Sequence, residues 1–293
     1  MKFLSPLLCF CLVASSGLHS WAQSVDASDY KIYDVKQKRT VKLADVVNAV
    51  ADTDVLFFGE EHNDAIGHYL QDQLYGLLIK RYGKVHLSLE MFETDCQQVL
   101  NEYLAGYITE SKMRNDARPW DNYEEAYKPM VEKAKSNNLS VIAANAPRRY
   151  VNLVSRKGKD QLKSLPKSAR RYLAPLPIRT DDAAYLGRFN AIMGDASHSA
   201  DNNFFEAQCT WDATMAHRIY RHWKKNKKEL IFQLNGRFHS DYQQGTVGQL
   251  KRLRKKIKVK NISCFSAEDF DAPNWSQYTD MGDFIILSRP SDS

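Results

Sequence analysis

The sequence predicts an α/β fold, with a mainly parallel sheet flanked by helices on both faces. Several segments are almost continuously apolar, such as "DVLFF" at 54–58 and "IFQL" at 231–234, which is typical of strands buried on both faces. These segments alternate with longer ones whose apolar residues recur at helical spacing. Strands that alternate with helices along the chain favour a parallel sheet covered on both sides.

The expected elements follow in a regular order after a short strand near residues 30–35. Strand 54–60 leads into a helix that opens near Asn63–Asp64 and carries apolar residues at positions 66, 70, 74, 77 and 78. Further strands are predicted at 84–92, 139–145, 229–236, 258–265 and 282–288. Further helices are predicted at 96–108, 123–138, 207–226 and 246–256. Residues 150–205 are basic and rich in Pro, Ala and Tyr, and they predict a helical insertion.

Residues 1–22 predict a secretory signal peptide. Lys2 precedes the apolar run "FLSPLLCFCLVASSGL", and Ser20 and Ala22 suit the small-residue positions of a cleavage site, so we expect cleavage after Ala22. The run is shorter than the ~20 apolar residues that a spanning helix needs. Cys9 and Cys11 lie inside the run instead of beside the cut, which argues against lipid attachment there. We therefore expect an exported protein.

Charge and cysteine content narrow the class of partner. The chain has a net charge of +6, and much of it lies in residues 224–228 and 251–258. These runs are either solvated helix faces or a surface for an anionic small molecule or a negatively charged membrane. Export makes nucleic acid a poor partner. Without the signal peptide only Cys96, Cys209 and Cys264 remain, and no CxxC is present, so neither a disulfide framework nor a Cys-based zinc site is predicted. A single bridge in an oxidising compartment is the alternative for two of these cysteines.

Two matched Gly-x-x-His stretches, Gly59–His62 and Gly236–His239, each follow an apolar run, and Glu90 occupies a similar place on strand 84–92. Ligands of open α/β sheets bind at the carboxyl ends of the strands, so we predict that His62, Glu90 and His239 meet in one pocket. A glycine at such a point lets the chain turn sharply off the strand and leaves room for a ligand.

Two chemistries suit this pocket. Imidazole nitrogens and a carboxylate bind zinc, manganese or iron, so His62, Glu90 and His239 are candidate metal ligands. A histidine beside a glutamate can instead perform acid–base catalysis, for which Glu60 and Glu61 are candidates. The alternative for these two glutamates is that they cap the following helix. No GxSxG, GxxxxGK or GxGxxG motif supports a serine nucleophile or a phosphate-binding loop.

Five ordered motifs resemble the ChaN family of haem-binding proteins, which is linked to bacterial iron uptake. They are "LFFGEEHNDAIGHYLQ", "LSLEMFETDCQ", "VIAANAPRRYV", "AQCTWDATMA" and "NGRFHSDYQQGTVGQL", and the resemblance spans residues 35–288. The wider superfamily includes the Tiki metalloproteases and is related in fold to erythromycin esterases. The two Gly-x-x-His motifs and Glu90 match the Tiki-type hallmark.

The resemblance implies haem held by a tyrosine, in a dimer whose partner subunit supplies a histidine to the propionates. Tyr150 and Tyr185 are the candidate tyrosines, and His198 is the candidate histidine. Arg148 and Arg149 belong either to a solvated turn or to an anion-binding edge that pairs with propionates. A tyrosinate is a reasonable axial ligand for ferric haem.

Two functions follow from these observations. The first is an exported haem-binding protein of iron acquisition, periplasmic or peripherally associated with the outer membrane, with an outer-membrane haem-uptake receptor as a candidate partner. The second is a metal-dependent hydrolase that uses the His62, Glu90 and His239 pocket. Family members are often lipoproteins, and this chain departs from that pattern because it has no lipobox. A structural or adhesive role is a third alternative, against which the pocket argues.

Overall fold

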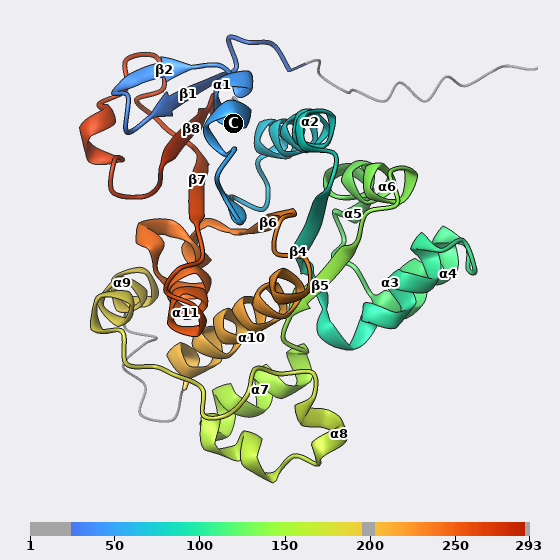
Figure 1. The fold of residues 1–293 in the computed structure, drawn as a ribbon. Coiled ribbons are helices and arrows are strands. Elements are labelled where there is room, and N and C mark those ends of the chain that lie inside the picture. The colour runs from blue at the N-terminus through green and yellow to red at the C-terminus, as the bar shows by residue number, and fades with distance from the viewer. Residues whose placement is uncertain (1–24, 195–202, 291–293) are drawn as a thin grey trace, which may run out of the picture.

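The computed structural model describes residues 25–194 and 203–290, which fold around one eight-stranded sheet (Figure 1). The strand order is β2-β1-β8-β7-β3-β6-β4-β5. Six strands run parallel: β3 (Val55–Glu60), β4 (Val85–Glu93), β5 (Val141–Asn145), β6 (Leu230–Gly236), β7 (Val259–Ser266) and β8 (Phe284–Ser288). β1 (Tyr30–Asp34) and β2 (Arg39–Val41) pair antiparallel at one edge. The predicted fold class is confirmed.

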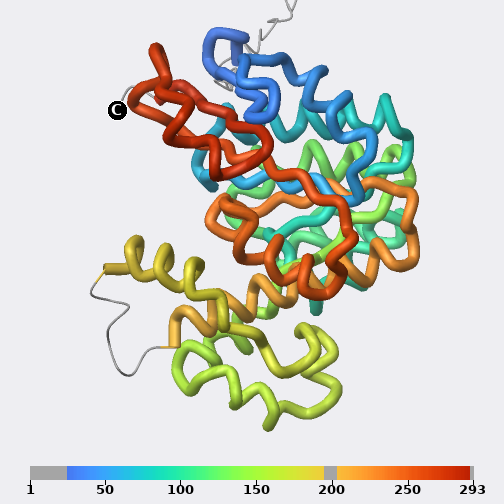
Figure 2. Tube along the Cα trace, turned by 60° about the vertical axis from the view of Figure 1, so that its left-hand side comes forward, coloured from blue at the N-terminus to red at the C-terminus, as the bar shows by residue number. Residues whose placement is uncertain are grey.

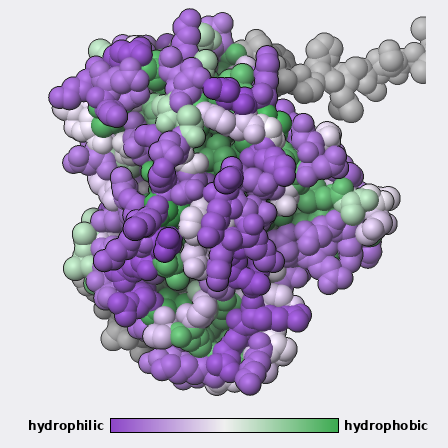
Figure 3. Space-filling model, viewed as in Figure 1, coloured by the Kyte–Doolittle hydropathy of each residue, from purple (hydrophilic) through white to green (hydrophobic). Residues whose placement is uncertain are grey.

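Helices cover both faces of the sheet, as the apolar strands require. Because side chains alternate along a strand, Leu56 and Phe58 of β3 join one hydrophobic cluster while Val55 and Phe57 join another. The first cluster includes side chains of α1 (Leu43–Ala49), α2 (Ala65–Tyr82), α3 (Gln97–Leu104), α4 (Glu110–Ala117), α5 (Tyr123–Ala126) and α6 (Lys128–Ser136). The second includes α10 (Phe204–Lys225) and α11 (Gly245–Leu253). Hydrophilic residues cover most of the molecular surface that is visible in Figure 3.

The helical insertion packs below the sheet as a separate layer (Figure 2). It contains α7 (Arg148–Lys157), α8 (Lys167–Arg170) and α9 (Ala183–Met193), and its apolar side chains form a cluster with the first half of α10. Within the described residues the predicted insertion is mainly helical, with an irregular stretch at 171–182 between α8 and α9. The predicted signal peptide and His198 lie outside the described residues.

Side-chain caps fix where several helices begin. Asp64 accepts a hydrogen bond from the backbone N–H of Gly67 at 3.0 Å, so α2 starts close to the predicted position. Asp182 caps α9 in the same way. The structure also contains α1, β2 and α4, which the sequence pattern did not reveal. Each is short, with three to eight residues, too few for a clear period.

The edge strand β5 is protected by one side chain. Gln97 of α3 accepts a hydrogen bond from the Ala143 N–H at 2.9 Å and donates one to the Val141 carbonyl at 2.8 Å. Its amide therefore occupies the place of a neighbouring strand and pairs backbone groups that an exposed edge would leave open. Arg218 of α10 donates to the same Gln97 oxygen at 3.1 Å, which ties the edge to the helix behind it.

We predict that Gln97→Leu lowers the free energy of unfolding by about 1–3 kcal/mol, because two backbone groups of β5 lose their partners. Urea unfolding followed by circular dichroism measures this change. Gln98→Leu is the matched control, because Gln98 is exposed and its side chain bonds Glu102 alone among residues 25–194 and 203–290. Equal stability of the two variants would contradict the edge-protection role.

Candidate functional site: an acid–base cluster at the carboxyl edge of the sheet

The end of β3 holds a buried carboxylate against an exposed imidazole. Glu60 is 2 % exposed, and its Oε1 lies 2.8 Å from His62 Nδ1. Tyr127 donates a hydrogen bond to the same oxygen at 2.5 Å, and Gln71 donates to the other. With its Nδ1 proton directed at Glu60, His62 has no hydrogen-bond partner for Nε2 among the described residues, and about half of its side chain is exposed.

A second histidine lies on the far side of Glu90. Glu90 accepts a hydrogen bond from the Gly236 N–H at 2.8 Å, and its Oε1 lies 3.4 Å from His239 Nε2. The register of β4 against β5 shifts between Leu89 and Glu93, so Glu90 lies at an irregularity that re-aims its side chain. A Cβ on Gly236 would meet His62 Nε2 at 2.9 Å and lie 3.9 Å from Glu90 Oε2. The two motifs and Glu90 are thus brought together, as the sheet topology predicts.

Asp212 of α10 belongs to the same cluster and contacts His239. It is fully buried, and its Oδ1 lies 2.7 Å from His239 Nδ1. Thr246 donates to Oδ1 and Tyr185 to Oδ2, both at 2.9 Å. His239 therefore bridges two buried carboxylates, Asp212 and Glu90. Sequence reasoning missed Asp212, although an acidic residue among the apolar side chains of "CTWDATMA" was a usable signal.

The protonation states follow from this arrangement. Burial alone would lower the pKa of His239, but the charges of Glu90 and Asp212 outweigh it and raise the pKa. Burial alone would raise the pKa of Glu90, but His239 and His62 hold it below its ordinary value. For His62, the hydrogen bond to Glu60 and the charge of Glu90 also overcome burial and raise the pKa. These shifts favour a charged Glu90 beside a protonated His239.

A second group of predicted residues lies at the start of α7. Tyr150 is half-buried, and the guanidinium of Arg149 lies 4.4 Å from its ring centroid. Arg149 also pairs with Asp95 at 2.5 Å. Arg148 makes no ion pair within the described residues, and it lies 5.9 Å from the ring centroid of Trp120. Trp120 in turn packs edge-on against His62, with ring centroids 4.7 Å apart, so the two groups are continuous.

The other candidates occupy structural positions. Tyr185 is 2 % exposed, and burial and the charge of Asp212 raise its pKa well above the ordinary value. Glu61 accepts a hydrogen bond from the Ser266 N–H at 3.1 Å and ties the loop after β3 to β7. The helix cap proposed for Glu60 or Glu61 belongs to Asp64.

Metal ligation by His62, Glu90 and His239 finds no support in this geometry. In the part of the chain that the structure describes, no group of three or more His, Cys, Asp or Glu side chains is arranged to hold a metal ion. Each imidazole instead directs its Nδ1 at a carboxylate. The metal site therefore stays a prediction, and the observed contacts favour acid–base chemistry.

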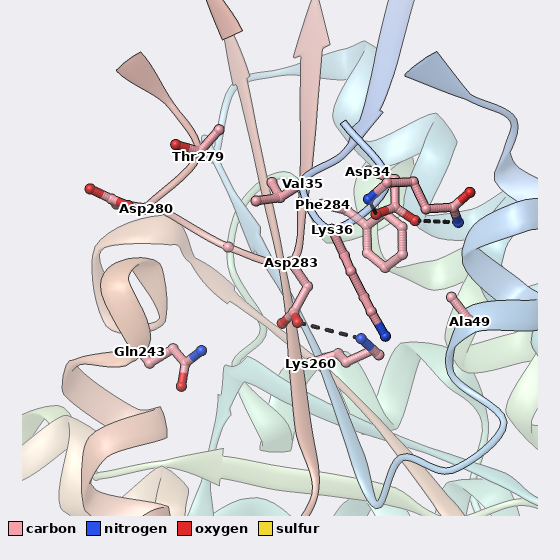
Figure 4. A pocket seen from close by; sticks show the side chains of 12 residues that line it. Asp34, Val35, Lys36, Ala49, Gln243, Lys260, Thr279, Asp280, Asp283 and Phe284 are labelled. Atoms are coloured by element: carbon pink, nitrogen blue, oxygen red, sulfur yellow. Dashed lines mark hydrogen bonds and ion pairs between the residues drawn. The ribbon is translucent and has the colours of Figure 1, made fainter. Parts of the chain in front are cut away.

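A hollow of about 580 Å³ lies away from this cluster, beside the starts of β7 and β8 (Figure 4). Phe284 and Ala49 contribute apolar surface, and Asp283 pairs with Lys260 at 3.4 Å. None of the candidate residues lines it. No helix in residues 25–194 and 203–290 is long and apolar enough to cross a membrane.

The fold and the cluster define a class: a parallel α/β protein with paired histidine–carboxylate groups at the carboxyl edge of its sheet. Within that class, the chain belongs to the family described as haem-binding uptake, Tiki superfamily, ChaN, whose model matches residues 46–250. The family predicted from the five motifs is thus confirmed. No curated protein matches the chain.

A solved structure supports the fold. The structure titled "Cofacial heme binding to ChaN of Campylobacter jejuni" is similar, with a TM-score of 0.67 and 15 % identity over 89 % of this chain and 98 % of that chain. A mutant erythromycin esterase in its open conformation has a TM-score of 0.47 and 11 % identity over 90 % of this chain and 84 % of that chain.

We predict that His239 stays protonated at pH 8, because Glu90 and Asp212 both stabilise its imidazolium. Nitrogen-15 NMR of the histidine rings measures this state. His217 and His222 are internal controls: burial lowers the pKa of each to about 4, so both should be neutral at pH 5. Asp212→Asn should shift the titration of His239 to lower pH. A titration of wild-type His239 near the ordinary pKa of about 6.5 would contradict the bridge.

The same cluster predicts how stability depends on pH. The raised pKa of His239 contributes stability that is present below about pH 6.5 and is lost as pH rises through the folded value. The lowered pKa of Glu90 contributes stability that is present above about pH 4.5 and is lost as pH falls. The contribution of the pair is therefore largest between these limits, and urea unfolding of Glu90→Gln across pH should show its loss there.

Proposed function

We propose that this protein binds haem through Tyr150, as an exported protein of bacterial iron acquisition. Membership of the haem-binding uptake family supports haem as the ligand. The observation that carries the tyrosine assignment is the contact between Tyr150 and Arg149, whose guanidinium lies 4.4 Å from the ring and donates to the phenol oxygen at 3.4 Å. Arg149 can keep a charge-assisted hydrogen bond to the phenol oxygen when that oxygen binds ferric iron.

Tyr185 suits this role less well. Its hydroxyl already donates to Asp212, and deprotonation would place a second negative charge beside a buried carboxylate. Tyr150 lies in the first turn of α7, where the helix dipole also favours an anion. Arg148, which has no ion-pair partner among the described residues, is the side chain available for a haem propionate. Arg149 is already paired with Asp95.

The proposal includes three features of the wider assembly. The similar Campylobacter structure is titled for cofacial haem, which supports a dimer that brings two haems face to face. His198 of the partner subunit would then contact a propionate, and an outer-membrane receptor would exchange haem with the dimer.

Export would be accompanied by removal of residues 1–22, so mass spectrometry of the exported chain should find an N-terminus near Gln23.

We predict that Tyr150→Phe abolishes the tyrosinate-type visible spectrum of the hemin complex and weakens hemin binding at least tenfold, because the charged oxygen that holds ferric iron is gone. Titration of the full chain with hemin measures both. Tyr185→Phe is the matched control and should keep the spectrum. Arg148→Gln should weaken binding without changing the spectrum, because it removes only the contact proposed for a propionate. An unaltered spectrum in Tyr150→Phe would overturn the ligand assignment.

The carboxyl-edge cluster favours a second function, hydrolysis by acid–base catalysis. His62 Nε2 has no hydrogen-bond partner among the described residues, while Glu60 accepts the Nδ1 proton, so the neutral form of His62 can take a proton from water. Protonated His239 lies across Glu90 from it and can donate a proton to a leaving group. This arrangement supports hydrolysis without requiring the metal that the sequence suggested.

We predict that, if the chain hydrolyses esters, His62→Asn lowers kcat at least about 100-fold, because the general base is lost. A panel of p-nitrophenyl esters measures the rate. Tyr150→Phe should leave it unchanged, which separates this activity from haem binding. Loss of activity after treatment with a chelator would instead favour the metal-dependent mechanism.

A further inference from the structure

The positive charge of the chain is concentrated before the starts of β6 and β7, opposite the acid–base cluster at the carboxyl ends of the strands. Residues 224–229 and 251–258 contain ten Lys and Arg and one Glu, a formal charge of +9 against +6 for the whole chain. The rest of the chain is therefore slightly acidic. Such a distribution creates a positive potential near these residues that the net charge of the whole chain does not reveal.

The fold brings the two runs together. The Leu230 N–H donates to the Lys84 carbonyl, the Ile231 N–H to the Asp54 carbonyl, and the Val55 N–H to the Lys258 carbonyl. The segments before β4, β6, β3 and β7 therefore lie side by side. Only β3 separates β6 from β7, so the starts of these two strands are about 10 Å apart. We call residues 224–228 and 254–258 the basic edge.

Most of these cations have no ion-pair partner. Lys258 pairs with Asp52, and nearby Lys84 pairs with Glu229. Seven exposed side chains of the basic edge make no ion pair within residues 25–194 and 203–290: Lys224, Lys225, Lys227, Lys228, Arg254, Lys255 and Lys256. Repulsion among them costs stability unless an anionic partner is present.

Helix capping explains only part of the pattern. Lys224 and Lys225 lie in the last turn of α10, where cations stabilise the negative end of the helix dipole. Lys227, Lys228, Lys255 and Lys256 lie beyond the helices, so the dipole does not account for them. These four side chains require another explanation.

We propose that the basic edge docks this protein on an anionic phospholipid surface. Seven of its eight cations are Lys, whose flexible point charges suit a diffuse headgroup layer better than bidentate recognition. Leu253, at the end of α11, is 42 % exposed beside them and offers an apolar contact to the interface. Stacking on nucleic-acid bases would need exposed aromatic rings, and among residues 224–229 and 251–258 the exposed large apolar side chain is this leucine.

Docking in this orientation leaves the functional site accessible. His62, Glu90 and His239 lie near the carboxyl ends of β3, β4 and β6, and the basic edge lies before the starts of β6 and β7, which run parallel to β3. The cluster and the start of α7 would therefore face away from the lipid. A ligand or a partner protein could reach them while the chain stays bound.

The test uses the full chain and sedimentation with vesicles of phosphatidylcholine, with or without about 30 % phosphatidylglycerol, at about 50 mM and about 300 mM salt. We expect binding to the anionic vesicles alone, and weaker binding at the higher salt. Combined Lys227→Glu, Lys228→Glu, Lys255→Glu and Lys256→Glu should reduce binding at least about 100-fold, since each cation near such a surface contributes roughly fivefold.

A variant with the same charge change elsewhere is the matched control: Lys36→Glu, Lys112→Glu, Lys157→Glu and Lys167→Glu, all at exposed positions. It should keep most of the vesicle binding. The circular dichroism spectrum and thermal unfolding of both variants should match those of the wild type, which shows that each is folded. Equal losses in the two variants would overturn the proposal. So would binding to duplex DNA or polyglutamate that depends on the basic edge without any preference for anionic vesicles.

Discussion

The hydrogen bond from the Gly236 N–H to Glu90 is the contact on which the functional edge depends. It joins the end of β6 to a carboxylate of β4, and the imidazoles of both Gly-x-x-His stretches lie against it. Gly236 is required for steric reasons, because a Cβ there would lie 2.9 Å from the His62 ring. Gly59 is constrained in the same way, by Ser240 and the Arg237 backbone. The spacing of each motif is thus a packing requirement as well as a chemical one.

Burying carboxylates is costly unless donors surround them, and the protein meets that cost through helices on both faces. Glu60 accepts hydrogen bonds from Tyr127 and Gln71 on one face of the sheet. Asp212 accepts hydrogen bonds from Tyr185 and Thr246 on the other face. The helical insertion therefore does more than cover the sheet. Because Tyr185 belongs to α9, the insertion also supplies a donor to the carboxylate that holds His239. The hydrogen bond to Asp212 makes Tyr185 a structural residue. Of the two candidate tyrosines, Tyr150 is therefore the more accessible.

Sequence patterns predicted the sheet well because buried parallel strands are apolar throughout, and residues such as Val55–Phe58 carry that signal without any tertiary information. They also predicted the meeting of His62, Glu90 and His239, since strand ends define an edge. They did not predict Asp212, Tyr127 or Gln97, because each acts through a partner far away in sequence. Nor did they separate Arg148 from Arg149. Only the position of Asp95 shows which of the two is already paired.

One topological fact gives the molecule two different ends. The six parallel strands all start at one edge and finish at the other, so the helices α2, α7 and α11 begin near the carboxyl edge and α10 and α11 end near the opposite one. Helix N-termini favour anions, which suits a phenolate or a propionate at the start of α7. Helix C-termini favour cations, which suits Lys224 and Lys251. The basic edge carries further cations beyond the ends of these helices. The proposed ligand site and the proposed attachment surface therefore lie at opposite ends of the parallel strands.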